Sequence, residues 1–421
     1  MVNLHIVQDT VFINDFADLL TGMGEISKHH FFVYYTDSKK SGEYKYLIDK
    51  KFENTRIVNV KLEELADESK KYKNVFIHLL SDILLDYVEK LDNNTNLIWC
   101  TWGSDFYCPD ELFAKYVLDE KSLKKYNGIL RKKIIDTIEV HKIPFSYRFF
   151  YDYLREKHRH GLRVKKAIEL HETLWEKYLE RKKILLKKVK HLANYGKDDY
   201  RFIAEHYNIN HSYLPFFYTC FDEKDNSVGE SIYLNKIISN KNQKKLFIGN
   251  CGTLHNNHLE ILPYLKKIKK DYNNAAFIVP LSYGDKEYIS FISDKYRKEL
   301  GGNFFPIYDF IEKEEYYRIL NSIDVMLMNH NINQGGTNLF KAIYYGKKVF
   351  IKNKNPLGNF LKENGVKLLD IENELLRNIK NLFNPITEEE HSKNRKAINS
   401  VFSKEKAASG FRHILESVNH D

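Results

Sequence analysis

Short aliphatic runs alternate with amphipathic stretches twice along this chain, and that pattern constrains the fold more than any other feature. In the first half the runs predict strands at residues 4–7, 29–35, 56–60, 74–80 and 96–102. A second series starts afresh, with strands predicted at residues 245–250, 275–281, 303–308, 324–329 and 347–352. Strands that alternate with helices form layered α/β sheets with parallel strands. We therefore predict two doubly wound, Rossmann-like α/β domains that face each other across a cleft.

The predicted domains are separated by a polar stretch. A chain of 421 residues exceeds what one core usually serves, and DEKDNSVGES at 222–231 has no apolar periodicity. We predict an N-terminal domain at 1–225, a C-terminal domain at 240–400 and a C-terminal helix at 401–421. Near the end of the first domain, Asp198 and Asp199 are placed to open a helix that follows a further strand.

The positive charge of the chain is concentrated in one segment. The formal net charge is +9, and residues 151–190 alone hold 13 Lys and Arg against 6 Asp and Glu. Aliphatic residues recur there at near-helical spacing, so we predict a basic helical insertion at about 110–188. A basic amphipathic helix can lie on an anionic bilayer. A solvated helical hairpin and a nucleic-acid contact are the alternatives.

Membrane-spanning and disulfide-rich classes do not fit the sequence. No segment reaches the roughly 18 uninterrupted apolar residues of a spanning helix. The N-terminus lacks a basic region followed by an apolar one, so we expect a cytosolic protein and a first strand instead of a signal peptide. Four cysteines show neither a C-x-x-C pair nor zinc spacing, which predicts reduced thiols.

A glycine pair stands where a predicted strand ends and an apolar helix begins. Free backbone N–H groups at a helix N-terminus form an anion site, and glycines let a diphosphate approach the backbone. A tight turn without a ligand is the alternative, and the pattern is neither a P-loop nor a dinucleotide fingerprint. The residues predicted to bind a ligand in this loop are Gln334, Gly335, Gly336, Thr337 and Asn338.

Two further loops follow predicted strands at the same sheet edge. Loops at the carboxyl ends of parallel strands converge on one crevice, so we expect these loops to surround one ligand with phosphates and hydroxyls, such as a sugar nucleotide. Each histidine taken alone is equally consistent with a hydrogen-bonding surface residue. The candidate residues are Gly249, Asn250, Gly252, Asn256 and His258 in the first loop, and Ser282, Tyr283 and Gly284 in the second.

These loops resemble those of a known enzyme family. GNCGTLHNNHLEIL, IVPLSYGDKEYI, EEYYRILNSIDVMLMNHNINQGGTNLFKAIYYGKKVFIKNKNPL and WCTWGSDFY are similar, in the same order, to the TDP-N-acetylfucosamine:lipid II N-acetylfucosaminyltransferases, glycosyltransferase family fifty-six. The similarity spans roughly 96–107 and 246–357, with a weaker likeness in KKVKHLANYGKDDYRFI.

The resemblance implies a GT-B architecture in which the C-terminal domain holds the nucleotide sugar and the N-terminal domain holds the acceptor. It implies transfer of an N-acetylfucosamine-like deoxyamino sugar from a dTDP-sugar to a polyprenyl-diphosphate-linked saccharide, as in the synthesis of enterobacterial common antigen or O-antigen. The enzyme would be peripheral, at the cytoplasmic face of the inner membrane, touching the anionic surface through residues 147–190. No cofactor besides the donor and no nucleic-acid partner is expected.

Matched residue by residue, the sequence departs from the family at two points. Cys251 replaces a serine in the Gly-Asn-Ser-Gly loop. The arginine that precedes the family's Gln-Gln-Gly-x-Gly-Thr is absent, so another cation, such as Lys341 or Lys354, is needed against the diphosphate. The family's Trp-Gly-Ala-Asp corresponds to the segment from Trp102 to Asp105.

Glycosyl transfer needs stabilisation of the leaving diphosphate, an oriented acceptor hydroxyl and, for inversion, a base. Asp105 is the first candidate for the base, and the others are His78, at the end of a predicted strand, and Asp9, after the first predicted strand. Their alternative roles are a helix cap, a core histidine and a turn, respectively. No Asp-x-Asp stands at a strand end, so we predict no metal site and a metal-independent transferase.

Two other functions fit parts of the pattern. A sugar-nucleotide 2-epimerase shares the fold and acts on the donor alone, which leaves the basic insertion unexplained. A nucleic-acid-binding module would use the basic helices, yet the aromatic residues do not fall into a known RNA-binding pattern.

Overall fold

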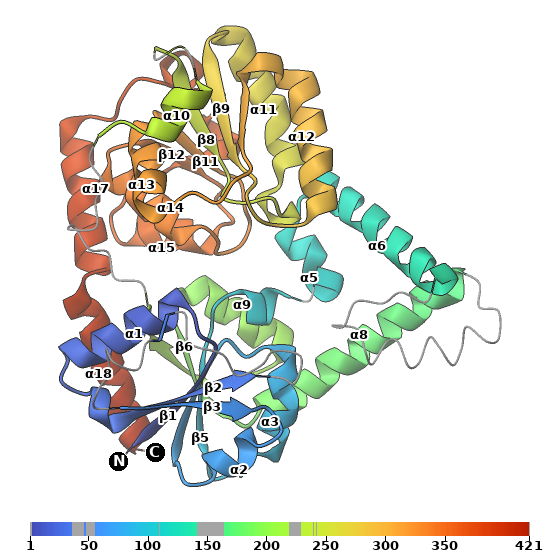
Figure 1. Cartoon of the computed structure of the whole chain (residues 1–421), viewed down its shortest axis with the longest axis vertical. Helices are drawn as coiled ribbons and strands as arrows, with labels where there is room; N and C mark the ends of the chain where they lie inside the picture. Colours follow the sequence, from blue (N-terminus) through green and yellow to red (C-terminus); the bar gives the residue numbers. More distant parts are fainter. Residues whose placement is uncertain are drawn as a thin grey trace.

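The computed structural model describes residues 2–35, 46–47, 55–108, 110–140, 164–218, 229–238, 240 and 242–420. They form two α/β domains, each built on its own parallel sheet (Figure 1). This arrangement confirms the predicted fold class of two facing doubly wound domains. The strands of both sheets fall within the predicted ranges 1–225 and 240–400, whose exact boundaries stay predictions.

The first sheet has the strand order β3-β2-β1-β4-β5-β6-β7, with every pair parallel. Helices cover both faces, so the central strands are buried throughout and read as continuous apolar runs. The strands are β1 (Asn3–Val7), β2 (His29–Tyr35), β3 (Arg56–Lys61), β4 (Asn74–His78), β5 (Asn96–Cys100), β6 (Val189–Asn194) and β7 (Ser212–Pro215). The helices that pack on this sheet are α1 (Val11–Gly22), η1 (Ile26–Lys28), α2 (Leu65–Ser69), η3 (Asp82–Leu84), α3 (Leu85–Lys90), α4 (Ser104–Tyr107) and α9 (Lys197–Tyr207).

The second sheet has the order β10-β9-β8-β11-β12-β13 and is also parallel. Its strands are β8 (Lys244–Ile248), β9 (Ala275–Pro280), β10 (Phe304–Ile307), β11 (Val325–Met328), β12 (Lys348–Ile351) and β13 (Leu369–Asp370). Its helices are α10 (Ile232–Ile237), η6 (Leu254–Asn256), α11 (His258–Asp271), α12 (Lys286–Leu300), η7 (Gly301–Asn303), α13 (Lys313–Ser322), α14 (Gly336–Tyr344), α15 (Pro356–Glu363), α16 (Ile371–Glu374), η8 (Ile379–Asn381) and α17 (Glu388–Val401).

The last helix, α18 (Lys404–His420), returns to the first domain, as the red ribbon in Figure 1 shows. The ring of Phe411 lies 4.9 Å from that of Phe16 in α1, and the Asn96 side chain donates a hydrogen bond of 2.8 Å to the backbone of Val418. The C-terminal helix is therefore part of the N-terminal domain's core, although it follows the second domain in sequence.

The basic insertion forms α5 (Asp110–Val117), α6 (Glu120–Val140) and α8 (Val164–Leu186). Helix α6 reaches the second domain, where the Ser122 hydroxyl donates to Glu260 over 2.6 Å. Helix α8 instead packs on the first domain through Lys182, whose buried ammonium donates to the backbone oxygen of Asp105 over 2.8 Å. The described part of the insertion thus ties the two domains together.

Two predicted segments fall partly outside the described residues. Of the proposed linker at 222–231, residues 222–228 lie outside them, and α10 follows with Ser231 as its N-cap. Of the proposed membrane-facing segment at 147–190, residues 147–163 lie outside them. No helix in the described ranges is both long and apolar enough to cross a membrane.

Candidate functional site

The loop after β8 is held by close backbone contacts. Gly249 has a φ of +69°, and the side-chain oxygen of Asn256 accepts a 2.9 Å hydrogen bond from the Asn250 backbone N–H. A bridge joins Gly252 to Gly284, where the Gly252 N–H donates to the backbone oxygen of Tyr283 over 2.8 Å. At Gly284, with a φ of +134°, an added Cβ would lie 2.3 Å from the Gly252 oxygen, so the loops after β8 and β9 fit together only with glycine at this contact.

The loop before α14 lies against the loop after β8. Gly335 has a φ of +68°, and a Cβ there would lie 3.1 Å from the Cβ of Asn250. The side chain of Gln334 donates to the sulfur of Cys251 over 3.1 Å, and so does that of Asn256 over 3.3 Å. The sulfur thus accepts hydrogen bonds although it replaces the serine hydroxyl of the resembling family.

Helix α14 points its N-terminus at this junction. It starts at Gly336, and Thr337 and Asn338 stand in its first turn, where helix N–H groups lack intrahelical partners. The Asn338 side chain donates to the Tyr316 hydroxyl over 2.9 Å. The structure therefore brings together most of the predicted donor-binding residues in a site that suits an anion.

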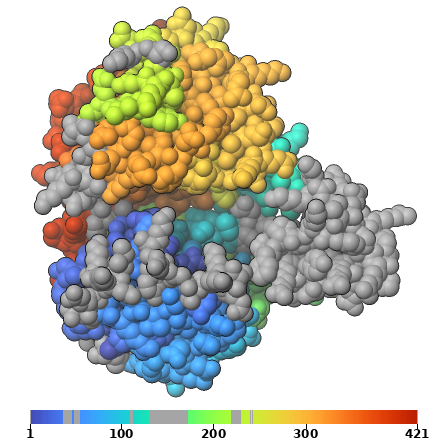
Figure 2. All heavy atoms as spheres, in the orientation of Figure 1, coloured from blue at the N-terminus to red at the C-terminus, as the bar shows by residue number. Residues whose placement is uncertain are grey.

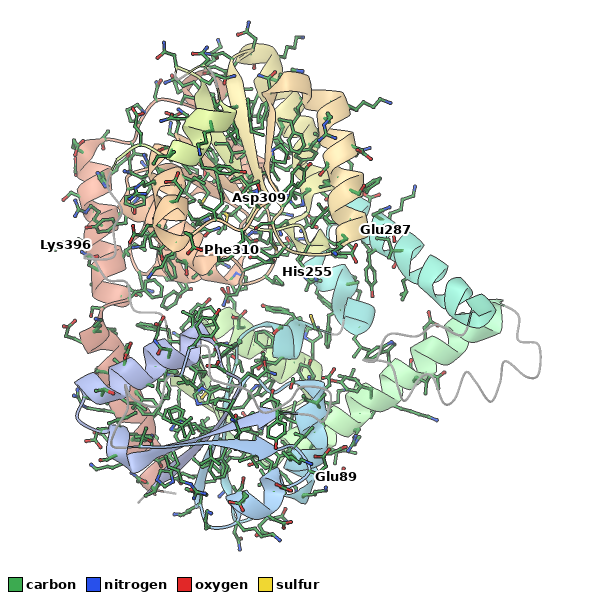
Figure 3. The ribbon with its side chains drawn as sticks, viewed as in Figure 1. Glu89, His255, Glu287, Asp309, Phe310 and Lys396 are labelled. Carbon is green, nitrogen blue, oxygen red and sulfur yellow. The ribbon has the colours of Figure 1, made fainter. Side chains whose placement is uncertain are left out.

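Three aromatic side chains are exposed beyond β9 and β10. Tyr283 is 59%, Tyr308 43% and Phe310 84% exposed, and Figure 3 labels Phe310 and Asp309 on the second domain. The hydroxyl of Tyr283 accepts a 3.3 Å hydrogen bond from the Asn250 side chain, while its neighbour Ser282 is half-buried. Tyr283 is among the predicted binding residues, whereas Tyr308 and Phe310, which follow the edge strand β10, are not.

His258 is enclosed in the second domain's core. Its Nδ1 lies 3.2 Å from the Tyr288 hydroxyl, and burial lowers its pKa to about 3, so the ring is neutral at pH 7. It begins α11, next to Asn257, whose side chain bonds across the domain interface instead of entering the cleft. The donor contact predicted for His258 stays a prediction, and the geometry gives its ring a packing role.

Asp119, at the corner between α5 and α6, is the centre of that interface. Its backbone N–H donates to Asn257 over 2.9 Å, and its carboxylate accepts from the Asn331 side chain over 3.0 Å and pairs with the buried Lys352. These contacts hold the start of α11 and the segments that follow β11 and β12 against the corner between α5 and α6.

The predicted catalytic carboxylate, Asp105, is buried and fully hydrogen-bonded. Its oxygens accept from the backbone N–H groups of Leu80, Trp102 and Gly103 and from the indole of Trp99, at 2.7 to 3.2 Å. Burial raises its pKa. This carboxylate shapes the turn after β5, and its assignment as a base stays a prediction that the geometry does not favour.

The other two predicted catalytic groups also make internal contacts. His78 is buried between His5, 2.8 Å away, and the hydroxyl of Tyr218, 2.5 Å away, and burial lowers its pKa to about 3. Asp9 accepts hydrogen bonds from the backbone N–H groups of Tyr46 and Leu47. Their roles as bases likewise stay predictions.

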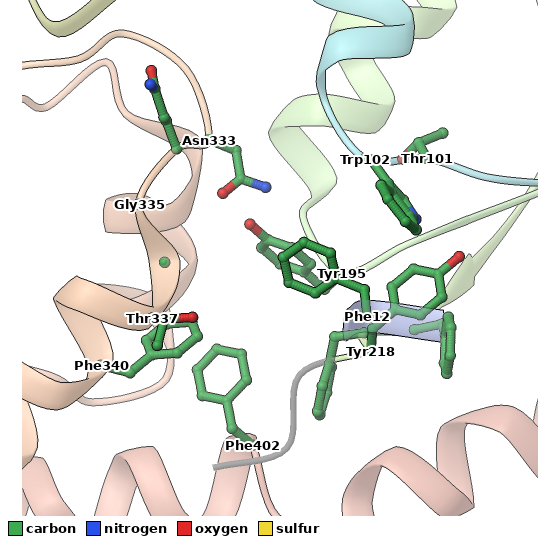
Figure 4. Close-up of a pocket in the computed structure, with 14 residues that line it drawn as sticks. Phe12, Thr101, Trp102, Tyr195, Tyr218, Asn333, Gly335, Thr337, Phe340 and Phe402 are labelled. Carbon is green, nitrogen blue, oxygen red and sulfur yellow. The ribbon is translucent and has the colours of Figure 1, made fainter. Parts of the chain in front are cut away.

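A cleft of about 280 Å³ opens between the domains, beside the Gly335 loop (Figure 4). The space-filling view shows the surface hollowed between the two domains (Figure 2). Aromatic rings dominate its walls, and they come from segments far apart in sequence. The first domain contributes Phe12, Thr101, Trp102, Tyr195, Phe216, Phe217 and Tyr218, and the second contributes Asn333, Gln334, Gly335, Gly336, Thr337, Phe340 and Phe402.

Apart from Trp102, which lies in a segment that resembles the family, the aromatic residues of the cleft were not among the predicted site residues, because no local motif marks them. Among the residues that the structure describes, no group of three or more His, Cys, Asp and Glu side chains is arranged to hold a metal ion. What the cleft offers is an anion site on one wall and flat apolar surfaces on the other.

Comparisons with known proteins agree with this architecture. The family model for 4-alpha-L-fucosyltransferase, glycosyl transferase group 56, matches residues 172–406, more than half of the chain. No curated protein sequence matches significantly.

Solved structures of glycosyltransferases share the fold over nearly the whole chain. A glycosyltransferase from Rickettsia africae ESF-5 is 12% identical, with a TM-score of 0.58, and covers 99% of this chain and 98% of its own. Anabaena HepE in complex with UDP and glucose is 9% identical, with a TM-score of 0.61, over 99% and 100%. Sucrose-phosphate synthase from Thermosynechococcus elongatus is 9% identical, with a TM-score of 0.60, over 100% of both chains. At these identities the likeness shows the GT-B fold.

Proposed function

Since the chain belongs to the 4-alpha-L-fucosyltransferase family, glycosyl transferase group 56, we propose that it transfers an N-acetylfucosamine-like deoxyamino sugar from a dTDP-sugar to a polyprenyl-diphosphate-linked saccharide. It is a glycosyltransferase with the GT-B fold. The observation that carries the proposal is the cleft in which a glycine-rich helix N-terminus faces a wall of aromatic rings. The product would enter bacterial surface polysaccharide.

The donor site lies in the second domain under this proposal. The diphosphate would accept hydrogen bonds from the backbone N–H groups of Gly336, Thr337 and Asn338. The exposed rings of Tyr283 and Phe310 would flank the nucleotide base. HepE, a protein of the same fold, is known in complex with UDP, which supports a nucleotide-sugar donor. We prefer dTDP on the family resemblance.

A cation is still needed against the diphosphate, and the structure distinguishes the two candidates. Lys341 is buried, with its ammonium 4.4 Å from the centre of the Tyr317 ring. Lys354 is exposed on the turn that follows β12. We therefore assign the role to Lys354, which can move toward a bound diphosphate without leaving a buried site.

The acceptor would occupy the aromatic part of the cleft. Rings such as Trp102, Tyr195 and Phe12 offer flat faces for the C–H groups of a sugar. The acceptor hydroxyl attacks the anomeric carbon, the bond from that carbon to the diphosphate oxygen breaks, and the hydroxyl proton passes to a base. The helix N-terminus then stabilises the charge on the departing nucleoside diphosphate.

Peripheral binding at the cytoplasmic face of the inner membrane is also part of the proposal. In the described part of α8, Arg181 is paired with Asp86 and Glu89, and Lys182 is buried. Among the described residues, Lys177 in α8, Lys187 just after it and Lys190 in β6 are also exposed, so we place the contact with anionic lipid on them.

The membrane contact is tested by charge reversal, because deletion of the insertion would remove Lys182 from the core. Lys177→Glu, Lys187→Glu and Lys190→Glu together should reduce sedimentation with vesicles that contain phosphatidylglycerol and leave nucleotide binding unchanged. Wild-type sedimentation of the triple variant would contradict the assignment.

Transfer itself is tested with purified enzyme, a panel of dTDP-, UDP- and GDP-sugars and polyprenyl-diphosphate-linked saccharides. The proposal predicts a lipid-linked product from a dTDP-deoxyamino sugar. An altered sugar nucleotide formed without any acceptor would indicate a 2-epimerase instead.

A further inference from the structure

The N-terminal turn of α9 carries two carboxylates that face the second domain. Asp198 accepts a 2.8 Å hydrogen bond from the side chain of Asn359 in α15. Asp199 is completely buried, and its Oδ1 accepts from the Tyr107 hydroxyl over 2.5 Å. Its Oδ2 is buried without a close hydrogen-bond partner.

Asn333, which comes from the second domain, lies between this turn and the donor loop. It directly precedes Gln334 and Gly335. Burial raises the pKa of both Asp199 and Tyr195, and a hydrogen bond from the Asn333 side chain offsets part of that rise at each group. Its backbone oxygen lies 3.7 Å from where a Cβ on Gly103 would stand. Figure 4 shows the Asn333 side chain directed across the cleft toward Tyr195.

We propose that Asp199 is a positioning residue for glycosyl transfer: its carboxylate holds the Asn333 amide and so fixes the Gly335 loop relative to the acceptor cleft. The buried Oδ2 has no hydrogen-bond partner, and the neighbouring Asn194 amide donates to the Thr101 hydroxyl over 2.5 Å, which leaves Oδ2 to the Asn333 amide. The inference rests on the proposed function, since it requires that the Gly335 loop binds the nucleotide-sugar donor. The sequence pattern predicts only a helix start at Asp199.

The charge of Asp199 decides how firmly Asn333 is held. Burial raises its pKa to about 7, and the side chains of Tyr107, Asn194 and Asn333 act in the opposite direction. In the described part of the chain, the titratable groups that face it are Asp198, Tyr107, Tyr195 and Tyr213, and none of them is a cation. An ionised carboxylate accepts a stronger hydrogen bond than a protonated one. The hold on the donor loop should therefore weaken as the pH falls through about 7.

Asp199→Asn removes the charge and keeps the shape. A hydrogen bond to a charged group is worth about 1.5 to 3 kcal/mol, so we expect kcat/KM for the donor to fall about tenfold to a hundredfold at pH 8. The decline of wild-type donor kcat/KM between pH 8 and 6 should be absent from the variant. Glu205→Gln, the same change at an exposed position of α9, should follow the wild type.

A second variant covers the case in which Asp199→Asn does not fold. Asn333→Ala lies at the cleft and should reproduce both the loss at pH 8 and the flat pH profile, and combining the two changes should add little. If either folded variant had the donor kcat/KM and the pH profile of the wild type, the inference would be wrong. Binding of dTDP to the wild-type protein would still support the proposed function in that case. If the wild type bound no nucleotide, the proposed function would fail and the inference with it.

Discussion

Replacing Gly335 by alanine tests whether the donor loop depends on a left-handed backbone packed against Asn250. The φ of +68° costs a residue with a Cβ roughly 1 to 2 kcal/mol. The added Cβ would lie 2.9 Å from the Met328 methyl and 3.1 Å from the Asn250 Cβ, and such overpacking costs about 1 to 3 kcal/mol. The expected loss of stability is therefore about 2 to 5 kcal/mol.

Gly336 is the matched control, because a Cβ there meets nothing nearer than 3.5 Å and its φ is ordinary. For a domain of this size, Gly335→Ala should lower Tm by roughly 4 to 20 °C, whereas Gly336→Ala should change it by less than about 2 °C. Calorimetry of both variants measures the difference.

In ligand binding the control is a glycine outside the donor site. Gly335→Ala should weaken nucleotide binding, because Gln334 and the start of α14 move with it. Gly302→Ala, where an added Cβ has nothing within 4 Å, should bind nucleotide like the wild type. Equal Tm values for Gly335→Ala and Gly336→Ala, together with wild-type nucleotide affinity in Gly335→Ala, would refute the reasoning.

Three further predictions concern other parts of the site. Phe12→Ala, at a half-exposed ring 5.4 Å from that of Trp102, should raise the acceptor KM about threefold to tenfold without changing donor affinity in steady-state kinetics. Asn256→Ala leaves the buried Asn250 N–H without its acceptor and should cost about 1 to 3 kcal/mol in urea unfolding, whereas Asn242→Ala should cost little. Buried histidines with lowered pKa values take up protons only in the unfolded chain, so stability should fall from about pH 6.5 downward by up to about 1.4 kcal/mol per pH unit for each; an equal urea midpoint at pH 7.5 and 5.5 would contradict this. These histidines are His5, His29, His78, His258 and His330.

The strands that sequence reasoning placed correctly are those with long apolar runs. All ten strands of the two predicted series occur, with small differences at their ends, as does the further strand before Asp198. The edge strands β7 and β13 were missed: Ser212–Pro215 is short and carries a proline, and Leu369–Asp370 has two residues. Edge strands bury one side less completely, so their sequences carry a weaker signal.

The site divides in the same way. Glycine loops can be recognised in a sequence because tight turns and close backbone approach restrict the residue type. Gly249, Gly284 and Gly335 indeed have positive φ values. The aromatic wall was not predictable as a set: the family resemblance marks Trp102, whereas Phe12 and Phe402 join it only through the tertiary fold. The roles of the polar residues near strand ends could not be predicted, because they depend on burial. The Asp105 carboxylate accepts hydrogen bonds from the backbone around it, and His258 lies in the core.

The proposal depends above all on whether the three glycine loops bind a nucleotide sugar. The most direct test is to measure Tm of the purified chain as dTDP, UDP, GDP or CMP is added, with and without EDTA. A ligand that binds only the native state raises Tm as its concentration exceeds Kd. We expect dTDP to raise Tm more than the other nucleotides do, with EDTA present as well as absent, and we expect Gly335→Ala to lose most of this shift. No change in Tm with any nucleotide would contradict it.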